Sequence, residues 1–108
     1  MKALHTMRFV NNATVELTKY ETRLTSAETY ENAKNTARQM LGYLDCLITF
    51  MNTMICTENN DFTAEYNDVI DDWTARVYQL LANKAIETEQ DHDTIMKLLQ
   101  KRDEAAGE

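Results

Sequence analysis

The stretch YENAKNTARQMLGYLDCLITFMNTMIC, residues 30–56, decides the fold of this chain. Its apolar residues recur three and four positions apart, at Tyr30, Ala33, Ala37, Met40, Leu44, Leu47, Met51 and Met54. This spacing puts them on one face of an α-helix, which only Gly42 weakens. The letters TSAE at residues 25–28 have the form of a capping box, so we expect one helix from there to about Cys56.

The second half of this helix is apolar around most of its circumference. Only a narrow polar seam interrupts it, at Gly42, Asp45, Thr49 and Asn52. A helix of this kind needs several neighbours, from its own chain or from another copy. We therefore expect a homodimer or a higher oligomer built on this helix, with an interface that includes Tyr43, Leu47, Phe50, Met51 and Met54.

Helical spacing extends to both sides of this stretch. A seven-residue repeat that includes Leu17 and Leu24 predicts a helix over residues 2–23, and a second apolar face that includes Trp73 predicts one from about Asn60 or Asp61 to Ile86. Residues 87–93 form a hinge or a helix start before a short fourth helix. The chain has no proline and two glycines, so we predict an all-α fold: a small antiparallel helical bundle of three long helices and a short C-terminal helix. Residues 1–104 form one domain and residues 105–108 a frayed tail.

Charge is unevenly distributed along the chain, whose formal net charge is -7 over 108 residues. Residues 57–73 hold six acidic residues and no basic one: Glu58, Asp61, Glu65, Asp68, Asp71 and Asp72. Such a balance argues against direct nucleic-acid binding, because Lys and Arg must replace the counterions of the phosphates. It permits a protein partner with a basic surface, and these six residues are the predicted contact. The simpler alternative is a solvated helix face.

Two acid pairs suggest a second alternative. The pair Glu28 and Glu31 and the pair Glu65 and Asp68 resemble the ExxE and ExxD pairs of all-α nucleotide pyrophosphohydrolases similar to MazG. The resemblance implies magnesium held between neighbouring helices on a nucleotide triphosphate. In an antiparallel hairpin that turns near residue 59, however, the two pairs lie roughly 33 Å apart. They meet only if the second helix breaks near Gly42.

The remaining reactive residues give weaker indications of a functional site. Cys46 and Cys56 share one predicted helix, roughly 15 Å apart, so we expect free thiols, buried and inert. His92 follows Glu89 at helical spacing but lacks the further ligands of a di-iron site, and we expect it at the surface. A basic N-terminal cluster, Lys2, His5 and Arg8, could instead line an inter-subunit pocket for a small anionic ligand such as a nucleotide.

Together these patterns predict a small acidic helical protein without enzymatic activity, catalytic residues, metal or cofactor. We expect it to bind and modulate or inhibit another protein. It resembles, in size and composition, the regulators that phages and mobile elements direct against host defence or nucleic-acid-processing machinery. The most apolar window, residues 40–56, is too short and too polar to span a membrane, so we expect a cytoplasmic location.

Overall fold

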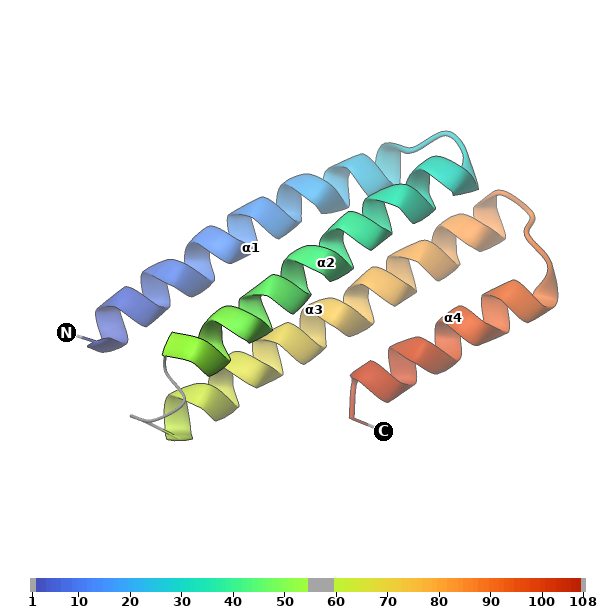
Figure 1. Cartoon of the computed structure of the whole chain (residues 1–108). Helices are drawn as coiled ribbons and strands as arrows, with labels where there is room; N and C mark the ends of the chain where they lie inside the picture. Colours follow the sequence, from blue (N-terminus) through green and yellow to red (C-terminus); the bar gives the residue numbers. More distant parts are fainter. Residues whose placement is uncertain (1, 55–59, 108) are drawn as a thin grey trace.

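Four helices make up the computed structural model, which describes residues 2–54 and 60–107, with side chains for residues 11–50 and 67–107. They are α1 (Lys2–Ser26), α2 (Tyr30–Met54), α3 (Asn60–Glu87) and α4 (His92–Ala105). Successive helices run in opposite directions (Figure 1). No strand occurs among the described residues, and the predicted all-α bundle of three long helices and one short one is confirmed.

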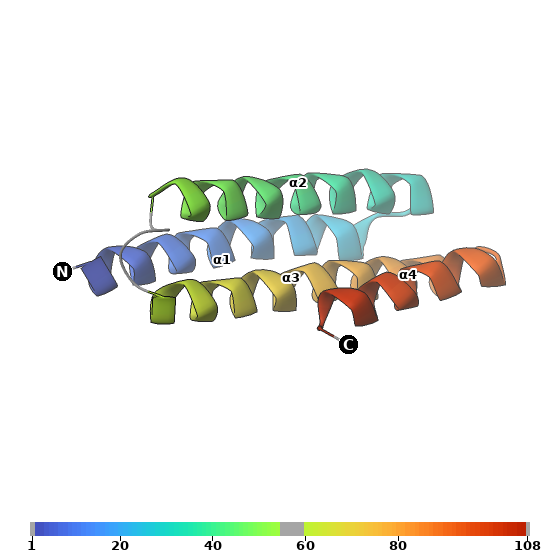
Figure 2. The same ribbon diagram turned by 60° about the horizontal axis from the view of Figure 1, so that its bottom comes forward.

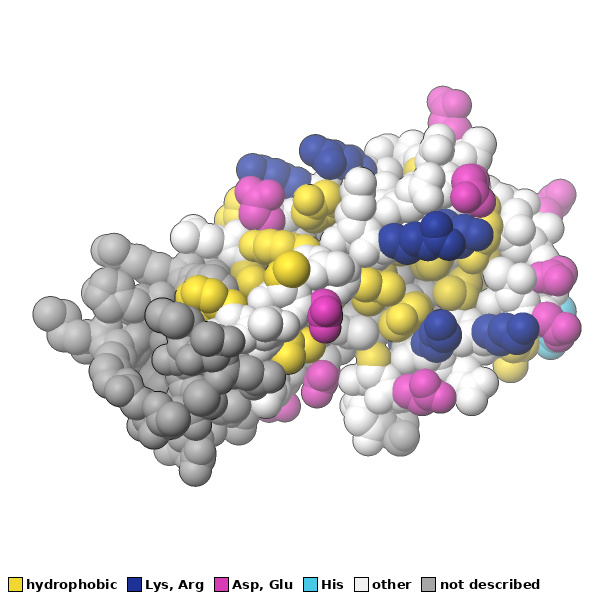
Figure 3. Space-filling view, viewed as in Figure 1, with side chains coloured by type: hydrophobic (Ala, Val, Ile, Leu, Met, Phe, Trp, Pro, Cys, Tyr) yellow, Lys and Arg dark blue, Asp and Glu magenta, His cyan; other side chains and the backbone are white. Residues whose placement is uncertain are grey.

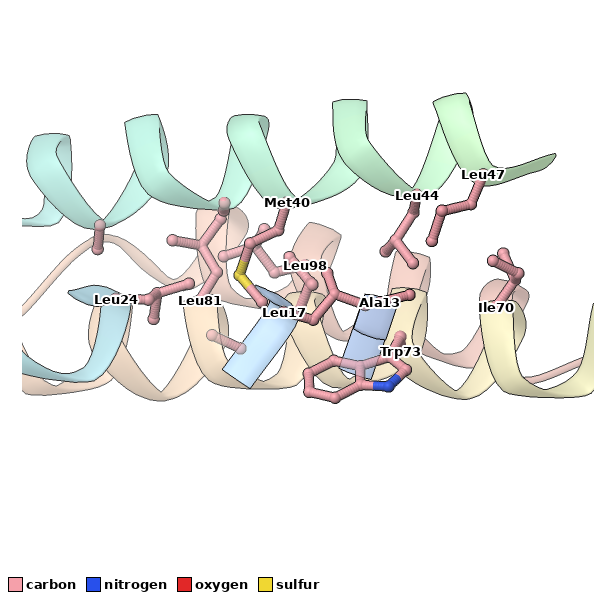
Figure 4. Packing of buried hydrophobic residues seen from close by; sticks show 14 of the residues in the cluster. Ala13, Leu17, Leu24, Met40, Leu44, Leu47, Ile70, Trp73, Leu81 and Leu98 are labelled. Carbon is pink, nitrogen blue, oxygen red and sulfur yellow. The ribbon is translucent and has the colours of Figure 1, made fainter. Parts of the chain in front are cut away.

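The core lies mainly between α1, α2 and α3, with one residue from α4, and follows the predicted apolar spacing. Figure 4 shows Met40, Leu44 and Leu47 pointing from α2 toward side chains of the other helices. The buried apolar residues are Ala13, Leu17, Leu24, Ala33, Ala37, Met40, Leu44, Leu47, Ile70, Trp73, Val77, Leu81, Ala82, Ala85 and Leu98. The helix α2 continues through Gly42 without a break, and a Cβ atom at that position would meet nothing within 4 Å.

The helix α3 is the centre of the molecule. It packs against α1, α2 and α4, whereas α4 packs against α3 and against no other described helix. Figure 2 shows α4 lying along the outer side of α3, away from α2. The architecture is therefore a three-helix bundle with one peripheral helix.

The turn between α1 and α2 lies four residues later than the capping box predicted. Thr25 belongs to α1, and its hydroxyl donates back to the carbonyl of Thr22 at 3.1 Å. The residue that caps α2 is Thr29, whose Oγ1 accepts a hydrogen bond from the Asn32 backbone N–H at 3.2 Å. The capping-box prediction was wrong, because α1 continues to Ser26 and leaves Thr25 and Glu28 no helix start to cap.

A buried lysine of α3 explains why α1 extends this far. The Lys84 side chain is almost fully buried, and its Nζ donates to the carbonyl oxygens of Thr25 at 3.0 Å and Ala27 at 2.9 Å. Carbonyls at a helix C-terminus lack partners within the helix, and a cation there is favourable. One side chain from α3 therefore caps α1 and fixes the turn that follows it.

The turn between α3 and α4 is stabilised by its own backbone. The Gln90 N–H donates to the Ala85 carbonyl at 2.8 Å, and the Glu89 N–H donates to the Ile86 carbonyl at 3.1 Å. This pair of bonds is the Schellman arrangement, and it puts Glu89 in the left-handed region at φ 59°. Asp91 then caps α4 by accepting from the Thr94 N–H at 3.1 Å.

Candidate functional site

Three exposed aspartates lie close together on α3. We call Asp68, Asp71 and Asp72 the acidic ridge; all three are exposed, at helical spacings of three and four. The residues between and beside them, Ile70 and Trp73, are buried in the core. The core residues therefore hold this part of α3 in place while the carboxylates face solvent.

The acidic ridge is not neutralised within the described part of the chain. No ion pair or hydrogen bond joins any of its three carboxylates to another described side chain. Arg76 stands four residues after Asp72, a spacing at which opposite charges on a helix ordinarily pair. Instead its guanidinium forms a bidentate ion pair with Glu21 of α1, with Nη2 to Oε2 at 3.0 Å. It also lies over the Trp73 ring, 5.0 Å from the centroid.

The other predicted partner-binding residues lie at or beyond the limit of the described structure. Glu58 is outside the described residues, and the side chains of Asp61 and Glu65 are outside them too. The same holds for the side chains of the predicted anion site, Lys2, His5 and Arg8. The acidic ridge is thus the described half of the predicted contact surface.

The residues predicted for an oligomer interface divide into three groups. Leu47 is 6% exposed and belongs to the core of its own chain, so it offers no surface to a second copy. Tyr43 is half-buried beside Tyr20 of α1, with ring centroids 6.4 Å apart, and Phe50 is 42% exposed. Burial, with the nearby Glu16 carboxylate and Tyr20, raises the pKa of the Tyr43 hydroxyl. Met51 and Met54 have side chains outside the described range, and the homo-oligomer stays a prediction.

Exposed apolar atoms do occur on α2. Figure 3 shows apolar side chains in a broken band along the α1 and α2 side of the molecule, between scattered charged groups. Cys46 is exposed on this helix as a free thiol, so the expectation of a buried Cys46 was wrong. In the described second half of α2, Leu44 and Leu47 are buried, and Leu41, Tyr43 and Ile48 are partly buried against the core. That another copy of the chain covers the rest of this apolar surface stays a prediction.

The described residues contain no site that suits a metal. No group of three or more His, Cys, Asp or Glu side chains is placed to hold an ion within the part of the chain that can be described. Because α2 is continuous, Glu28 and Glu31 lie at the end of the bundle opposite the start of α3, where Glu65 and Asp68 belong. The geometry thus separates the two acid pairs of the pyrophosphohydrolase resemblance. His92 is exposed at the start of α4, as predicted.

A small cavity lies among the described side chains between α1, α2 and α3. It has a volume of about 10 Å³ and is lined mainly by apolar side chains that include Leu17, Leu44 and Trp73. That is the space of about one water molecule, and a water needs several polar partners to remain in it. This cavity is therefore too small to hold a small-molecule ligand.

Two features of the described structure were missed in the sequence. Lys84 continues the three-and-four spacing of the core face after Val77 and Leu81, and a lysine at such a position signals a buried, paired cation. The pair Glu21 and Arg76 gave no signal, because the helices α1 and α3 that bring them together are far apart in the chain. Only the tertiary arrangement decides which acid Arg76 contacts.

Comparisons with known proteins identify no relative. A scan of protein-family models, a search of curated proteins and a search of solved structures each found no match. Within the described residues, no helix is both long and apolar enough to cross a membrane.

Proposed function

We propose that this chain binds a protein with a basic surface through the acidic ridge and the predicted contact residues that precede it, and thereby modulates or inhibits that protein. The observation that carries the proposal is that Asp68, Asp71 and Asp72 have no ion-pair partner among the described side chains, while the neighbouring Arg76 pairs with Glu21. A rigid row of carboxylates attracts a basic partner at long range and then supplies acceptors for its Lys and Arg side chains.

The energetics of the acidic ridge support the same proposal. Asp68 lies three and four residues from Asp71 and Asp72, and each like-charged pair at such a spacing disfavours a helix by about 0.2–0.5 kcal/mol. A partner that contributes guanidinium or ammonium groups would relieve this repulsion. Glu21 contributes indirectly, because its ion pair keeps the Arg76 guanidinium away from Asp72.

The partner class that we favour is a nucleic-acid-processing protein of a host cell. The groove of such a protein is lined with Lys and Arg for phosphates, and an acidic helix can occupy it in their place. This chain would then compete with the nucleic acid without binding nucleic acid itself. An origin in a phage or mobile element is part of this proposal.

The first test reverses the charge of the ridge. The double variant Asp68→Lys/Asp72→Lys is used as bait beside the wild-type chain in a pull-down from host lysate, and the captured partner is then titrated. We expect the affinity to fall at least about a hundredfold, since interfacial charge pairs are worth several kcal/mol when reversed. The matched control, Asp93→Lys/Glu104→Lys, makes the same change of net charge on α4 and should alter affinity only a few-fold. Wild-type affinity in the ridge variant would refute the contact surface.

A second variant tests the role of Glu21 without touching the ridge. In Glu21→Gln the guanidinium of Arg76 loses its bidentate partner and can turn to Asp72, one helical turn away. Partner binding should weaken several-fold while the helix content stays unchanged by circular dichroism. Glu16→Gln is the control, because it removes an exposed carboxylate of α1 that pairs only with Lys19 of the same helix. Equal affinities of the two variants would show that Arg76 does not affect the ridge.

A further inference from the structure

The contacts that hold α4 in place all come from α3. Leu98 is the buried residue of α4, and Ile95 and Leu99 pack against the core beside it. Arg102 donates to Gln79 Oε1, and the Lys101 ammonium lies 5.8 Å from the centre of the Tyr78 ring. Since α1 and α2 take no part among the described helices, any copy of α3 offers α4 the same site.

The hinge that joins these two helices is strained and can become helical. Glu89 is the one described non-glycine residue with a positive φ, at 59°, a conformation that L-residues other than Asn and Asp rarely adopt. Residues 88–91, Thr-Glu-Gln-Asp, include neither glycine nor proline, so nothing in them prevents α3 from continuing into α4. In a continuous helix Glu89 returns to right-handed geometry, and ordinary helical hydrogen bonds replace the two Schellman bonds.

We propose that α4 exchanges between two copies of this chain. In the exchanged dimer α3 and α4 form one straight helix, and the α4 of each copy packs on the α3 of the other. In the single chain α4 runs antiparallel to α3 (Figure 1). Two straightened helices can lie antiparallel to each other about a two-fold axis at the hinge. Each α4 then packs on the α3 of the other copy, so both α3–α4 contacts are restored and the dimer is closed. Short strained hinges promote such exchange. The Schellman bonds and the Asp91 cap favour the closed monomer, so the dimer should form at high concentration.

A crosslink between α3 and α4 distinguishes this dimer from any other. The variant Gln79→Cys/Arg102→Cys, with Cys46→Ser and Cys56→Ser, places one thiol on each side of the α3–α4 contact. The full chain is unfolded, refolded at low and at high concentration, separated by size and treated with a short bismaleimide. We expect the monomer to be crosslinked within one chain. We expect the dimer to give a covalent dimer on a denaturing gel.

The hinge variants supply the second measurement. Glu89→Gly removes the strain from the closed hinge of each monomer. Because two strained hinges are released when one dimer forms, stabilising both monomers should raise the dimer dissociation constant roughly tenfold or more. The control Glu28→Gly makes the same change in the α1–α2 turn, where φ is not positive, and should leave the constant unchanged. The proposal fails if the refolded chain stays monomeric at millimolar concentration. It fails equally if the dimer contains only crosslinks within single chains, which is the result expected for a dimer built on α2.

Discussion

The turn between α1 and α2 and the turn between α3 and α4 lie at the same end of the bundle (Figure 1), but different forces hold them. Both lead into a helix capped in the same way, by an oxygen of Thr29 in one and of Asp91 in the other, each accepting from the N–H three residues later. The difference lies in the helix that ends. The C-terminus of α1 is capped by Lys84 from another helix, whereas α3 caps itself through Glu89 and Gln90.

This difference determines which parts of the molecule depend on one another. A cap supplied by α3 makes the end of α1 depend on the packing of α3, so α1, α2 and α3 should unfold together. A cap made by the local backbone needs no contact from α1 or α2. The first turn therefore belongs to the cooperative core, and the second allows α4 to leave as a unit.

The largest effect should come from removing the tertiary cap. In Lys84→Met the apolar stem stays and the ammonium is lost, so the carbonyls of Thr25 and Ala27 lose a charged donor. We expect the free energy of unfolding to fall by about 2–3 kcal/mol, measured by urea denaturation, because charged hydrogen bonds in buried places are worth about that much. Lys97→Met removes an exposed lysine of α4 and should change stability by less than about 0.5 kcal/mol. Similar midpoints for the two variants would contradict a cap by Lys84.

A smaller effect distinguishes the observed cap of α2 from the predicted one. Thr29→Ala removes the oxygen that accepts from the Asn32 N–H and should lower the free energy of unfolding by about 1 kcal/mol. Thr25→Ala changes a residue inside α1 whose hydroxyl only bonds back to the preceding turn, and should be close to neutral. If Thr25→Ala were the more damaging substitution, the capping box read from the sequence would be right after all. Thermal melts of both variants at one protein concentration decide this.

The two turns also show how far the sequence predicts the fold. The long helices follow from apolar spacing alone, since Leu17, Leu24 and Met40 are buried as their spacing predicts. The hinge expected at residues 87–93 contains the observed α3–α4 turn, because its signals are local. The α1–α2 turn was misplaced, because it depends on Lys84, nearly sixty residues away, and a capping motif within four residues carries no information on such a contact.

The acidic ridge likewise has one property that the local sequence predicts and one that depends on contacts distant in the sequence. Its exposure could be predicted, because Asp68, Asp71 and Asp72 alternate with the buried Ile70 and Trp73 at helical spacing. Its unpaired state could not, because local spacing assigns Arg76 to Asp72, and only the packing of α1 against α3 gives it to Glu21. Helix spacing thus predicts which side chains face solvent. Contacts between residues distant in the sequence decide which of these side chains lack an ion-pair partner and can bind another molecule.

The smallest expected effect concerns pH and belongs to the local turn alone. Hydrogen bonds from the Thr94 side chain and its backbone N–H lower the pKa of the Asp91 carboxyl below its ordinary value of 3.8. A carboxyl whose pKa is lowered on folding contributes stability that is present above the pKa of the unfolded chain and is lost as the pH falls through the folded value. The cap of α4 should therefore weaken from about pH 4 downward, while the neutral cap at Thr29 keeps its strength.

Asp91→Asn provides the measurement, because asparagine also caps helices but does not titrate. The wild-type chain should melt at a higher temperature than this variant near neutral pH, and the difference should shrink as the pH falls below about 4. Asp93→Asn removes an equal charge from the first turn of α4 without removing a cap. Since Asp93 makes no capping bond, its variant should follow the wild-type pH profile more closely. Identical profiles for Asp91→Asn and Asp93→Asn would show that general helix-end charge, and not the cap, stabilises α4 at its start.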